Sequence, residues 1–284
     1  MIFVSYNIQW GMGKDERIDL SRITAEVGEA DVIAFQEVER FWTRSHRSDQ
    51  AAELAALFPE HHWVYGPGMD LDGSRRDEQG RLVTRRRQFG NMLLSRRPIL
   101  ASRNHMLPKM ALEEALSLQR AALEAVIEVP SGPPRVYSVH LNHSSAEERL
   151  GQIARLHEVI AGAAAEGGAW SGRNYDPVWE LDGLQPPLPE RAILLGDFNL
   201  TPESAEHAAL CGHSADGGTG GLVDSWLALG HEEGPGWTCH EDKGGWRIDY
   251  AFVTACLVDR LRAMSVDHAA QGSDHQPIRV EMDL

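Results

Sequence analysis

The stretch Ile193-Leu194-Leu195-Gly196-Asp197-Phe198-Asn199-Leu200-Thr201-Pro202 decides the fold prediction. Its leading apolar residues are typical of the end of a buried strand, Gly196 would let the backbone turn, and Pro202 would stop the segment. In an extended segment Asp197 and Asn199 would point the same way, because residues i and i+2 share one face. The pattern predicts either an ordinary strand-to-loop turn or a carboxylate placed for catalysis, and other segments must decide between them.

The composition favours a globular chain with a large apolar core. The chain has 284 residues, of which 42% are hydrophobic, and no run of about 18 apolar residues occurs. The first residues contain no basic leader followed by an apolar stretch. We therefore expect one domain over residues 1–284, with no membrane span and no signal peptide.

The cysteines and the net charge indicate which covalent or metal sites and which binding partners to expect. The three cysteines (Cys211, Cys239 and Cys256) are odd in number and far apart, which disfavours a disulfide framework or a thiolate zinc site and favours a reducing cytoplasm. The formal net charge is −15. Proteins that hold duplex DNA without sequence preference are usually basic on the binding face, so such binding is disfavoured, although a local basic groove is compatible with this charge.

Periodicity predicts many strands and a few amphipathic helices. A capping-box pattern, in which Ser144 is followed by Glu147, predicts the start of a helix with an apolar stripe. Residues 18–29 and 48–58 have helical spacing. The strands are expected at residues 2–8, 31–35, 89–95, 120–129, 135–141, 191–195, 247–253 and 278–282.

Polar side chains recur where these predicted strands end. The set is Asn7, Glu37, His140, Asp197, Asn199, Asp249, Asp274 and His275. Each one alone has an ordinary structural explanation, such as a turn residue, a surface carboxylate or a satisfied histidine. Together they form an oxygen-rich set that suits Mg²⁺ or Mn²⁺. A carboxylate paired with a histidine also suits proton transfer.

The order of these segments resembles the endonuclease/exonuclease/phosphatase superfamily, which includes deoxyribonuclease I, exonuclease III-type repair enzymes, inositol polyphosphate phosphatases and neutral sphingomyelinases. The resemblance covers nearly the whole chain and rests on Asn7, Gln36-Glu37, His140-Leu141-Asn142-His143, Gly196-Asp197-Phe198-Asn199, Arg247-Ile248-Asp249-Tyr250 and Ser273-Asp274-His275. It implies an α+β fold: a four-layer αββα sandwich of two mainly antiparallel sheets packed face to face, with helices outside and the site at one rim.

The resemblance also implies roles for the polar set. Glu37 would be the central metal ligand, helped by Asn7 and Asp274. Asp197 would orient or deprotonate the attacking water. The remaining roles are hydrogen bonds to the phosphoryl oxygens from Asn199 and His140, and alignment by Asp249 of His275, which would contact the phosphoryl group and serve in proton transfer.

Arg120 matches an arginine that the superfamily often places near the phosphate, but it could equally be a surface residue paired with Glu124 or Glu128. One departure is Phe89, where the abasic-site repair branch usually has a tyrosine before Gly90-Asn91. The missing hydroxyl and the acidic net charge both argue against a repair endonuclease.

We therefore predict a divalent-metal-dependent hydrolase of phosphoric esters, a phosphodiesterase or phosphatase acting on a small or lipid-derived substrate, and we expect a monomer. Two alternatives stay open: a nuclease of the same chemistry, and a non-catalytic binding module on the same fold. The intact polar set argues against the binding module, and fold alone does not fix the substrate.

Two irregular excursions are expected to flank the site. The first is an arginine-rich hairpin or loop around Arg75 to Arg87, in which Arg85, Arg86 and Arg87 could bind a compact anionic ligand or could simply be solvated. The second is rich in Trp and Pro and runs over residues 167–190. A groove for a single strand is the alternative, and the net charge favours the compact ligand. The glycine-rich residues 212–221 are predicted to be flexible.

Overall fold

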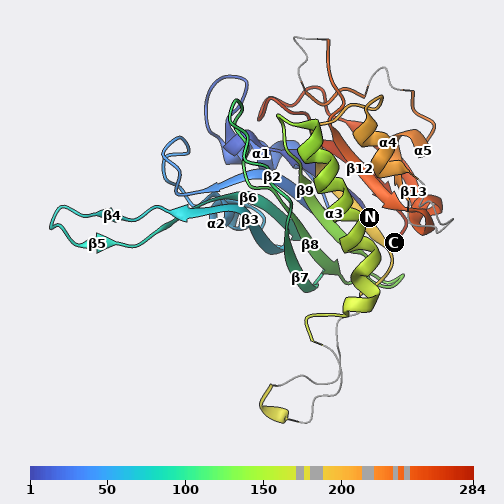
Figure 1. Ribbon diagram of the computed structural model, residues 1–284, viewed down its shortest axis with the longest axis horizontal. Coiled ribbons are helices and arrows are strands. Elements are labelled where there is room, and N and C mark those ends of the chain that lie inside the picture. Colours follow the sequence, from blue (N-terminus) through green and yellow to red (C-terminus); the bar gives the residue numbers. More distant parts are fainter. Residues whose placement is uncertain (171–175, 180–187, 213–220, 233–235, 240–243) are drawn as a thin grey trace.

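The computed structural model describes residues 1–170, 176–179, 188–212, 221–232, 236–239 and 244–284, and these residues form two large sheets packed face to face (Figure 1). In spatial order, the first sheet consists of β13 (Leu261–Val266), β14 (Ile278–Met282), β1 (Ile2–Asn7), β2 (Val32–Arg40), β6 (Arg86–Ser95) and β3 (His62–Asp72). The second consists of β11 (Leu222–Asp224), β12 (Asp249–Thr254), β10 (Ala192–Asp197), β9 (Arg135–His140), β8 (Ala121–Ile127) and β7 (Ile99–Met106).

Each sheet is antiparallel except for one parallel pair near its centre. In the first sheet β1 pairs in parallel with β2, and in the second β9 pairs in parallel with β10. A parallel pair needs a crossover connection, and a helix lies in each one: α1 (Leu20–Val27) between β1 and β2, and α3 (Ala146–Glu166) between β9 and β10. The prediction of two mainly antiparallel sheets is confirmed.

Alternating side chains on these strands build the four layers. In β1, Phe3 faces the core between the sheets, whereas Val4 and Tyr6 face outward and pack with residues of α1 and of α2 (Gln50–Leu57). In β10, Ile193 lies between the sheets, and Leu194 packs with residues of α3 and of α4 (Ala205–Cys211). Each sheet therefore has helices on its outer face, as the αββα prediction requires.

Shorter elements complete the fold. They are α5 (Ser225–Ala228), the 3-10 helices η1 (Gln9–Gly11), η2 (Pro177–Trp179) and η4 (Ala255–Arg260), and the hairpin strands β4 (Arg75–Arg76) and β5 (Leu82–Val83). Within the described residues, no helix has the length and apolarity needed to span a bilayer.

The start of α3 corrects the predicted capping box. The N-cap is Ser145, whose side chain accepts a hydrogen bond from Glu148 N at 3.2 Å. Ser144 instead donates its hydroxyl to Asn142 Oδ1 and to Leu116 O. The prediction was one residue early because the Asn142 side chain already accepts the Ser144 amide in a turn before the helix begins.

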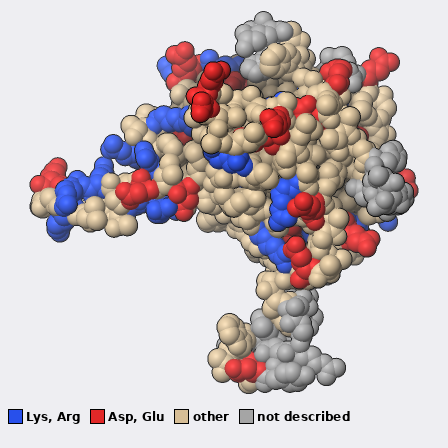
Figure 2. Space-filling view, viewed as in Figure 1, with Lys and Arg blue, Asp and Glu red and all other residues tan. Residues whose placement is uncertain are grey.

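The arginine-rich excursion is a long hairpin, the first of the two forms that the sequence left open. Strands β3 and β6 continue beyond the body of the first sheet, and β4 and β5 extend the ribbon to a tip that projects from the molecule (Figure 1). Basic side chains gather along this projecting ribbon, with acidic ones among them (Figure 2).

The described end of the second excursion lies away from the site, unlike the predicted flanking position. Its end at Pro189 accepts a hydrogen bond from Arg135, the first residue of β9, whereas the site residue His140 is the last residue of that strand. The segment enters β10 at Ala192, and the length of the strand, about 17 Å, separates Ala192 from Asp197 at its other end. Residues 171–175 and 180–187 of this segment, and 213–220 of the glycine-rich stretch, lie outside the described residues.

Gly196 serves close packing within β10 rather than a turn after it. It pairs with Val139 of β9, and a Cβ built on Gly196 would lie 1.9 Å from the Val139 carbonyl oxygen. A backbone atom cannot move aside as the end of a flexible side chain can, so a larger residue at this position would force β9 and β10 apart near the rim.

Replacing Gly196 by alanine should therefore destabilise the protein by about 3 kcal/mol, the upper part of the range for overpacking. Gly151→Ala is the matched control, because a Cβ at this position in α3 meets nothing within 4 Å. It should leave stability unchanged or raise it by about 0.5–1 kcal/mol. Urea unfolding of both variants measures the difference, and equal stabilities would contradict the packing role.

Candidate active site

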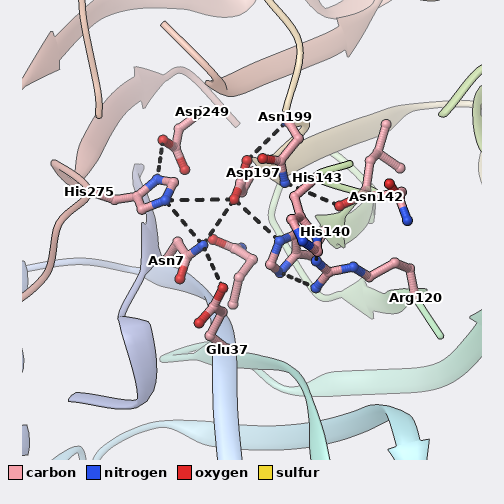
Figure 3. A network of polar contacts seen from close by, with 12 residues as sticks. Asn7, Glu37, Arg120, His140, Asn142, His143, Asp197, Asn199, Asp249 and His275 are labelled. Atoms are coloured by element: carbon pink, nitrogen blue, oxygen red, sulfur yellow. Dashed lines mark hydrogen bonds and ion pairs between the residues drawn. The ribbon is translucent and has the colours of Figure 1, made fainter. Parts of the chain in front are cut away.

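Polar side chains from both sheets meet at the rim where β1, β9 and β10 end (Figure 3). Asn7 is the last residue of β1, His140 of β9 and Asp197 of β10, and Asp249 is the first residue of β12. The parallel pairs direct their carboxyl ends to this one rim, so residues far apart in the sequence come within hydrogen-bonding distance.

Glu37 reaches the rim from a bulge inside β2, not from the end of the strand as predicted. The pairing of β2 with β6 shifts register between Phe35 and Val38, and the strand then continues to Arg40. Glu37 has a positive φ of 60°, which is unusual for a residue with a side chain. A bulge of this kind turns a side chain away from its regular direction, and here it turns the carboxylate toward Asn7.

Asp197 is the centre of the contacts. Its Oδ2 accepts a hydrogen bond from Asn7 Nδ2 at 2.9 Å and lies 3.3 Å from His140 Nε2, and its Oδ1 accepts the Asn199 amide at 2.9 Å. Burial raises the pKa of Asp197 to about 7, although the nearby His275 acts in the opposite direction. Asp197 can therefore gain or lose a proton near neutral pH.

Arg120 fixes the protonation of two histidines. It is buried, and its guanidinium lies 3.1 Å from His140 Nδ1 and 3.2 Å from His143 Nδ1. Since arginine only donates, both Nδ1 atoms must accept, and the proton of each neutral ring is on Nε2. Burial and the charge of Arg120 hold the pKa of His140 well below its usual range, so His140 presents an Nε2–H to Asp197.

His275 is the charged histidine of the site. Its Nδ1 lies 2.8 Å from Asp249 Oδ2, and its Nε2 lies 3.8 Å from Asp197 Oδ2. Burial alone would lower the pKa of His275, but the charges of Asp249 and Asp197 outweigh burial and raise that pKa well above its usual range. The two histidines beside Asp197 thus differ in charge, because one faces an arginine and the other an aspartate.

Asn199 and Asp274 lie next to this cluster. Asn199 has a φ of 52°, so the chain is no longer extended there, and its Nδ2 donates to Leu141 O at 3.2 Å. The predicted common direction of Asp197 and Asn199 is replaced by a tight turn. Asp274 is exposed beside the site, and the Ser273 hydroxyl before it donates to Asn7 O at 2.7 Å, which ties this segment to β1.

The donor set fits a divalent cation. Desolvation raises the pKa of Glu37, opposed by Arg120, and the neighbouring charge of Asp274 raises it further. Two carboxylates that repel each other in this way would both be stabilised by a bound cation. The carboxylate oxygens of Glu37 and Asp274 are the kind of ligand that hard cations prefer. Within the described residues, ligand atoms of Asp197, Asp249 and His275 also lie within 4.8 Å of one another.

Arg120 belongs to the site, whereas the three hairpin arginines make none of the contacts described above. Arg120 contacts His140 and His143 instead of pairing with Glu124 or Glu128. The Glu124 carboxylate is hydrogen-bonded to His105 and Tyr137. Arg86 pairs with Asp70 of β3 at 2.9 Å. The guanidinium groups of Arg85 and Arg87 lie over the rings of Phe41 and Trp42, respectively.

Two further residues at this rim had no assigned role in the sequence prediction. His143 is the second partner of Arg120, and its place in the His140-Leu141-Asn142-His143 segment was the available signal. Cys239 is buried, and its sulfur lies within 4.8 Å of ligand atoms of Asp274 and His275. A single cysteine has no sequence signal for such a position, which arises because Cys239 pairs with His275 in a backbone bridge.

Comparisons with known proteins agree with this geometry. Residues 4–275 match the profile described as the Endonuclease/Exonuclease/phosphatase family. No curated protein sequence matches the chain.

Solved structures share the fold at low sequence identity. An endonuclease/exonuclease/phosphatase from Beutenbergia cavernae superposes with a TM-score of 0.67 at 19% identity, covering 100% of this chain and 71% of that one. A mannosyl-6-phosphatase from Bacteroides thetaiotaomicron (TM-score 0.60, 16% identity) and a 3'-5' exonuclease from Neisseria meningitidis (TM-score 0.59, 18% identity) each match over 100% of both chains.

Replacing Arg120 by methionine should raise the pKa of His140, because a neighbouring cation is lost. The pKa should stay below the ordinary histidine value, since burial remains. Long-range ¹H–¹⁵N NMR titration of the imidazoles measures it. Arg103→Met is the control, because Arg103 pairs with Glu166 at the end of α3 far from this rim. An unchanged His140 in Arg120→Met would contradict the electrostatic assignment.

Proposed function

Because the chain belongs to the Endonuclease/Exonuclease/phosphatase family, whose members hydrolyse phosphoric esters, we propose that it is a Mg²⁺- or Mn²⁺-dependent enzyme acting on a small or lipid-derived phosphodiester or phosphomonoester. The observation that carries the proposal is the position of Asp197. This buried carboxylate is surrounded by three side chains, Asn7, His140 and His275, that can donate hydrogen bonds.

Asp197 suits the activation of a water molecule. A general base works best when its pKa lies near the operating pH, and burial raises the pKa of Asp197 to about 7. Asn7 Nδ2 and the Asn199 amide hold the two carboxylate oxygens in place. In our proposal Asp197 orients the attacking water and accepts its proton.

The two histidines suit the stabilisation of charge on the phosphoryl oxygens. His140 presents an Nε2–H fixed by Arg120, and His275 carries a positive charge maintained by Asp249. Donors that are already oriented cost little reorganisation when charge develops during the reaction. We assign His140 and Asn199 to hydrogen bonds with the phosphoryl oxygens. His275 contacts the same group and can return a proton to the leaving oxygen.

Glu37 would hold the divalent cation, with Asn7 and Asp274 as the further ligands. When bound, such an ion draws electron density from the phosphoryl oxygens as a Lewis acid. Glu37 lies close enough to Asn7 (3.5 Å between Oε1 and Nδ2) that the two side chains can serve one site.

The charge of the molecule favours the small substrate. The net charge of −15 repels a long polyanion from most of the surface, so a nucleic acid would have to be held by local groups alone. A compact phosphoric ester needs only the buried donors at the rim. The fold does not separate these classes, since solved structures of this fold include both a mannosyl-6-phosphatase and an exonuclease.

Metal dependence has two expected readouts. Hydrolysis should stop in EDTA and return with Mg²⁺ or Mn²⁺. The melting temperature should also rise with the cation, because a ligand present at about 100 times its Kd stabilises the folded state by about 2.7 kcal/mol. Glu37→Gln should abolish most of this rise.

The control for the metal experiment is Glu39→Gln. Glu39 lies on the same strand but pairs with Arg44 instead of facing the rim. This variant should keep the metal-induced rise in melting temperature, whatever its own stability. Full activity of the wild type in EDTA would refute the metal assignment.

Removal of the central groups should slow turnover. Asp197→Asn and His275→Ala should each lower kcat for bis-p-nitrophenyl phosphate by about 10² or more, the usual scale for a general base or a charge-stabilising donor. The folds should survive, because both residues lie at a rim. The wild type should hydrolyse this diester readily and cleave single- or double-stranded DNA slowly at physiological salt.

The chain offers a matched control for the histidine. His207 forms a buried pair with Asp224 at 3.0 Å, similar to His275 and Asp249, but it lies on α4 outside the rim. His207→Ala should keep kcat near the wild-type value. Near-normal turnover in Asp197→Asn would remove the proposed base, and efficient DNA degradation by the wild type would favour the nuclease alternative.

A further inference from the structure

A second basic site lies at the base of the projecting hairpin. A cavity of about 250 Å³ opens between the hairpin and the loop that follows β2. Four arginines and one acidic residue line it; the charged lining residues are Arg47, Arg75, Arg85, Arg87 and Asp72. The hairpin is also where basic side chains gather in Figure 2. Such a concentration of guanidinium groups is unexpected in a chain with a net charge of −15.

The one acidic residue, Asp72, offsets only part of the charge of the four arginines, and it forms no ion pair with any of them. Both the backbone amide and the hydroxyl of Ser74 donate to Asp72 Oδ1, at 3.2 and 2.7 Å. Other hairpin arginines have carboxylate partners, since Arg81 pairs with Asp77 and Arg86 pairs with Asp70. Within the described part of the chain, the four lining guanidinium groups form no ion pair of this kind. Their mutual repulsion would be relieved by an anion.

Aromatic rings lie beside two of the arginines that line the cavity. The Arg85 guanidinium lies 4.9 Å from the centre of the Phe41 ring, and that of Arg87 lies 5.1 Å from the centre of the Trp42 ring. Arg87 Nε is buried without a hydrogen-bond partner, which leaves a donor unsatisfied. A stacked guanidinium loses little freedom on binding, and its fork matches the oxygens of a phosphate.

The three consecutive arginines at the start of β6 differ in their surroundings. Arg85 and Arg87 are half-buried against the aromatic loop, whereas Arg86 between them is exposed and bonded to β3. Of these three consecutive arginines, Arg85 and Arg87 line the cavity together with Arg47 and Arg75, whereas Arg86 does not. Of the three arginines that the sequence analysis grouped as candidates for anion binding, this proposal therefore uses Arg85 and Arg87 and leaves out Arg86.

We propose that this arginine pocket binds a phosphate group other than the one that is hydrolysed. The ligand chemistry is a compact phosphate dianion, which supplies acceptors for several guanidinium groups at once. The inference goes beyond the proposed function and does not depend on it, because binding can be measured without turnover.

Isothermal titration with inorganic pyrophosphate in EDTA tests the pocket directly. Without a cation, the carboxylates of Glu37, Asp197 and Asp249 disfavour an anion at the rim, so the titration reports the arginine pocket. The wild type should bind one pyrophosphate. The double variant Arg85→Gln/Arg87→Gln should bind it at least about tenfold more weakly, through loss of two charge-assisted contacts.

Arg86→Gln is the matched control, because it removes one charge from the same strand on the opposite face. Its affinity for pyrophosphate should stay within about twofold of the wild type. No measurable binding by the wild type, equal binding by the double variant, or an equal loss in Arg86→Gln would each overturn the proposal. Melting curves of all variants check that the hairpin substitutions leave the fold intact.

The source of the phosphate can be separated with p-nitrophenyl esters of oligothymidylates one to six nucleotides long. If a remote phosphate of the substrate fills the pocket, KM should fall with length in the wild type but not in the double variant. If a free phosphate fills it, length should have the same effect on both proteins while pyrophosphate binding is still lost in the variant. Either result, together with the titration, supports the pocket and assigns its ligand.

Discussion

The hydrogen bond from Asn7 Nδ2 to Asp197 Oδ2, 2.9 Å long, joins the two sheets at the rim on which the active-site arrangement depends. Both residues are buried, with 1% and 2% of their surfaces exposed. A carboxylate in such a place must be hydrogen-bonded or protonated, because charge away from water is costly. Asp197 therefore needs donors from both sheets, and this need brings β1 and β10 into a fixed relation.

The topology makes this meeting possible. Each sheet has its parallel pair near the centre, and the crossover helices α1 and α3 cover the outer faces, so the carboxyl ends of the central strands stay open at the rim. Other polar contacts between the sheets hold the same relation. Gln36 Nε2 donates to Ser138 Oγ at 2.9 Å, and Asn91 Nδ2 donates to Ser138 O at 2.9 Å. The apolar core between the sheets fixes their spacing, and these bonds fix their register.

Several arginines of this acidic protein lie at defined positions beside histidine and aromatic rings. Arg120 is buried beside His140 and His143, where it sets the proton positions of both rings. Phe89 connects the site to the hairpin: its ring packs near His140, and the guanidinium groups of Arg120 and Arg44 each lie 5.9 Å from its centre. The guanidinium group of Arg44 also lies over the Trp42 ring, and that of Arg87 lies over the same ring. A row of alternating arginines and aromatic rings therefore runs from the rim to the arginine pocket.

The sequence by itself indicated the strands, the helices and the membership of the polar set, because alternation and strand-end positions are local properties, and the four layers followed from the resemblance to the superfamily. It placed β14 at residues 278–282 correctly and identified Asp197 and His275 as members of one group. Only the tertiary structure decided how that group is arranged. The bulge at Glu37, the close approach at Gly196 and the neighbourhood of Cys239 depend on partner strands remote in the sequence. The different protonation states of His140, which is neutral, and His275, which is charged, likewise depend on which side chain, Arg120 or Asp249, the fold brings to each ring.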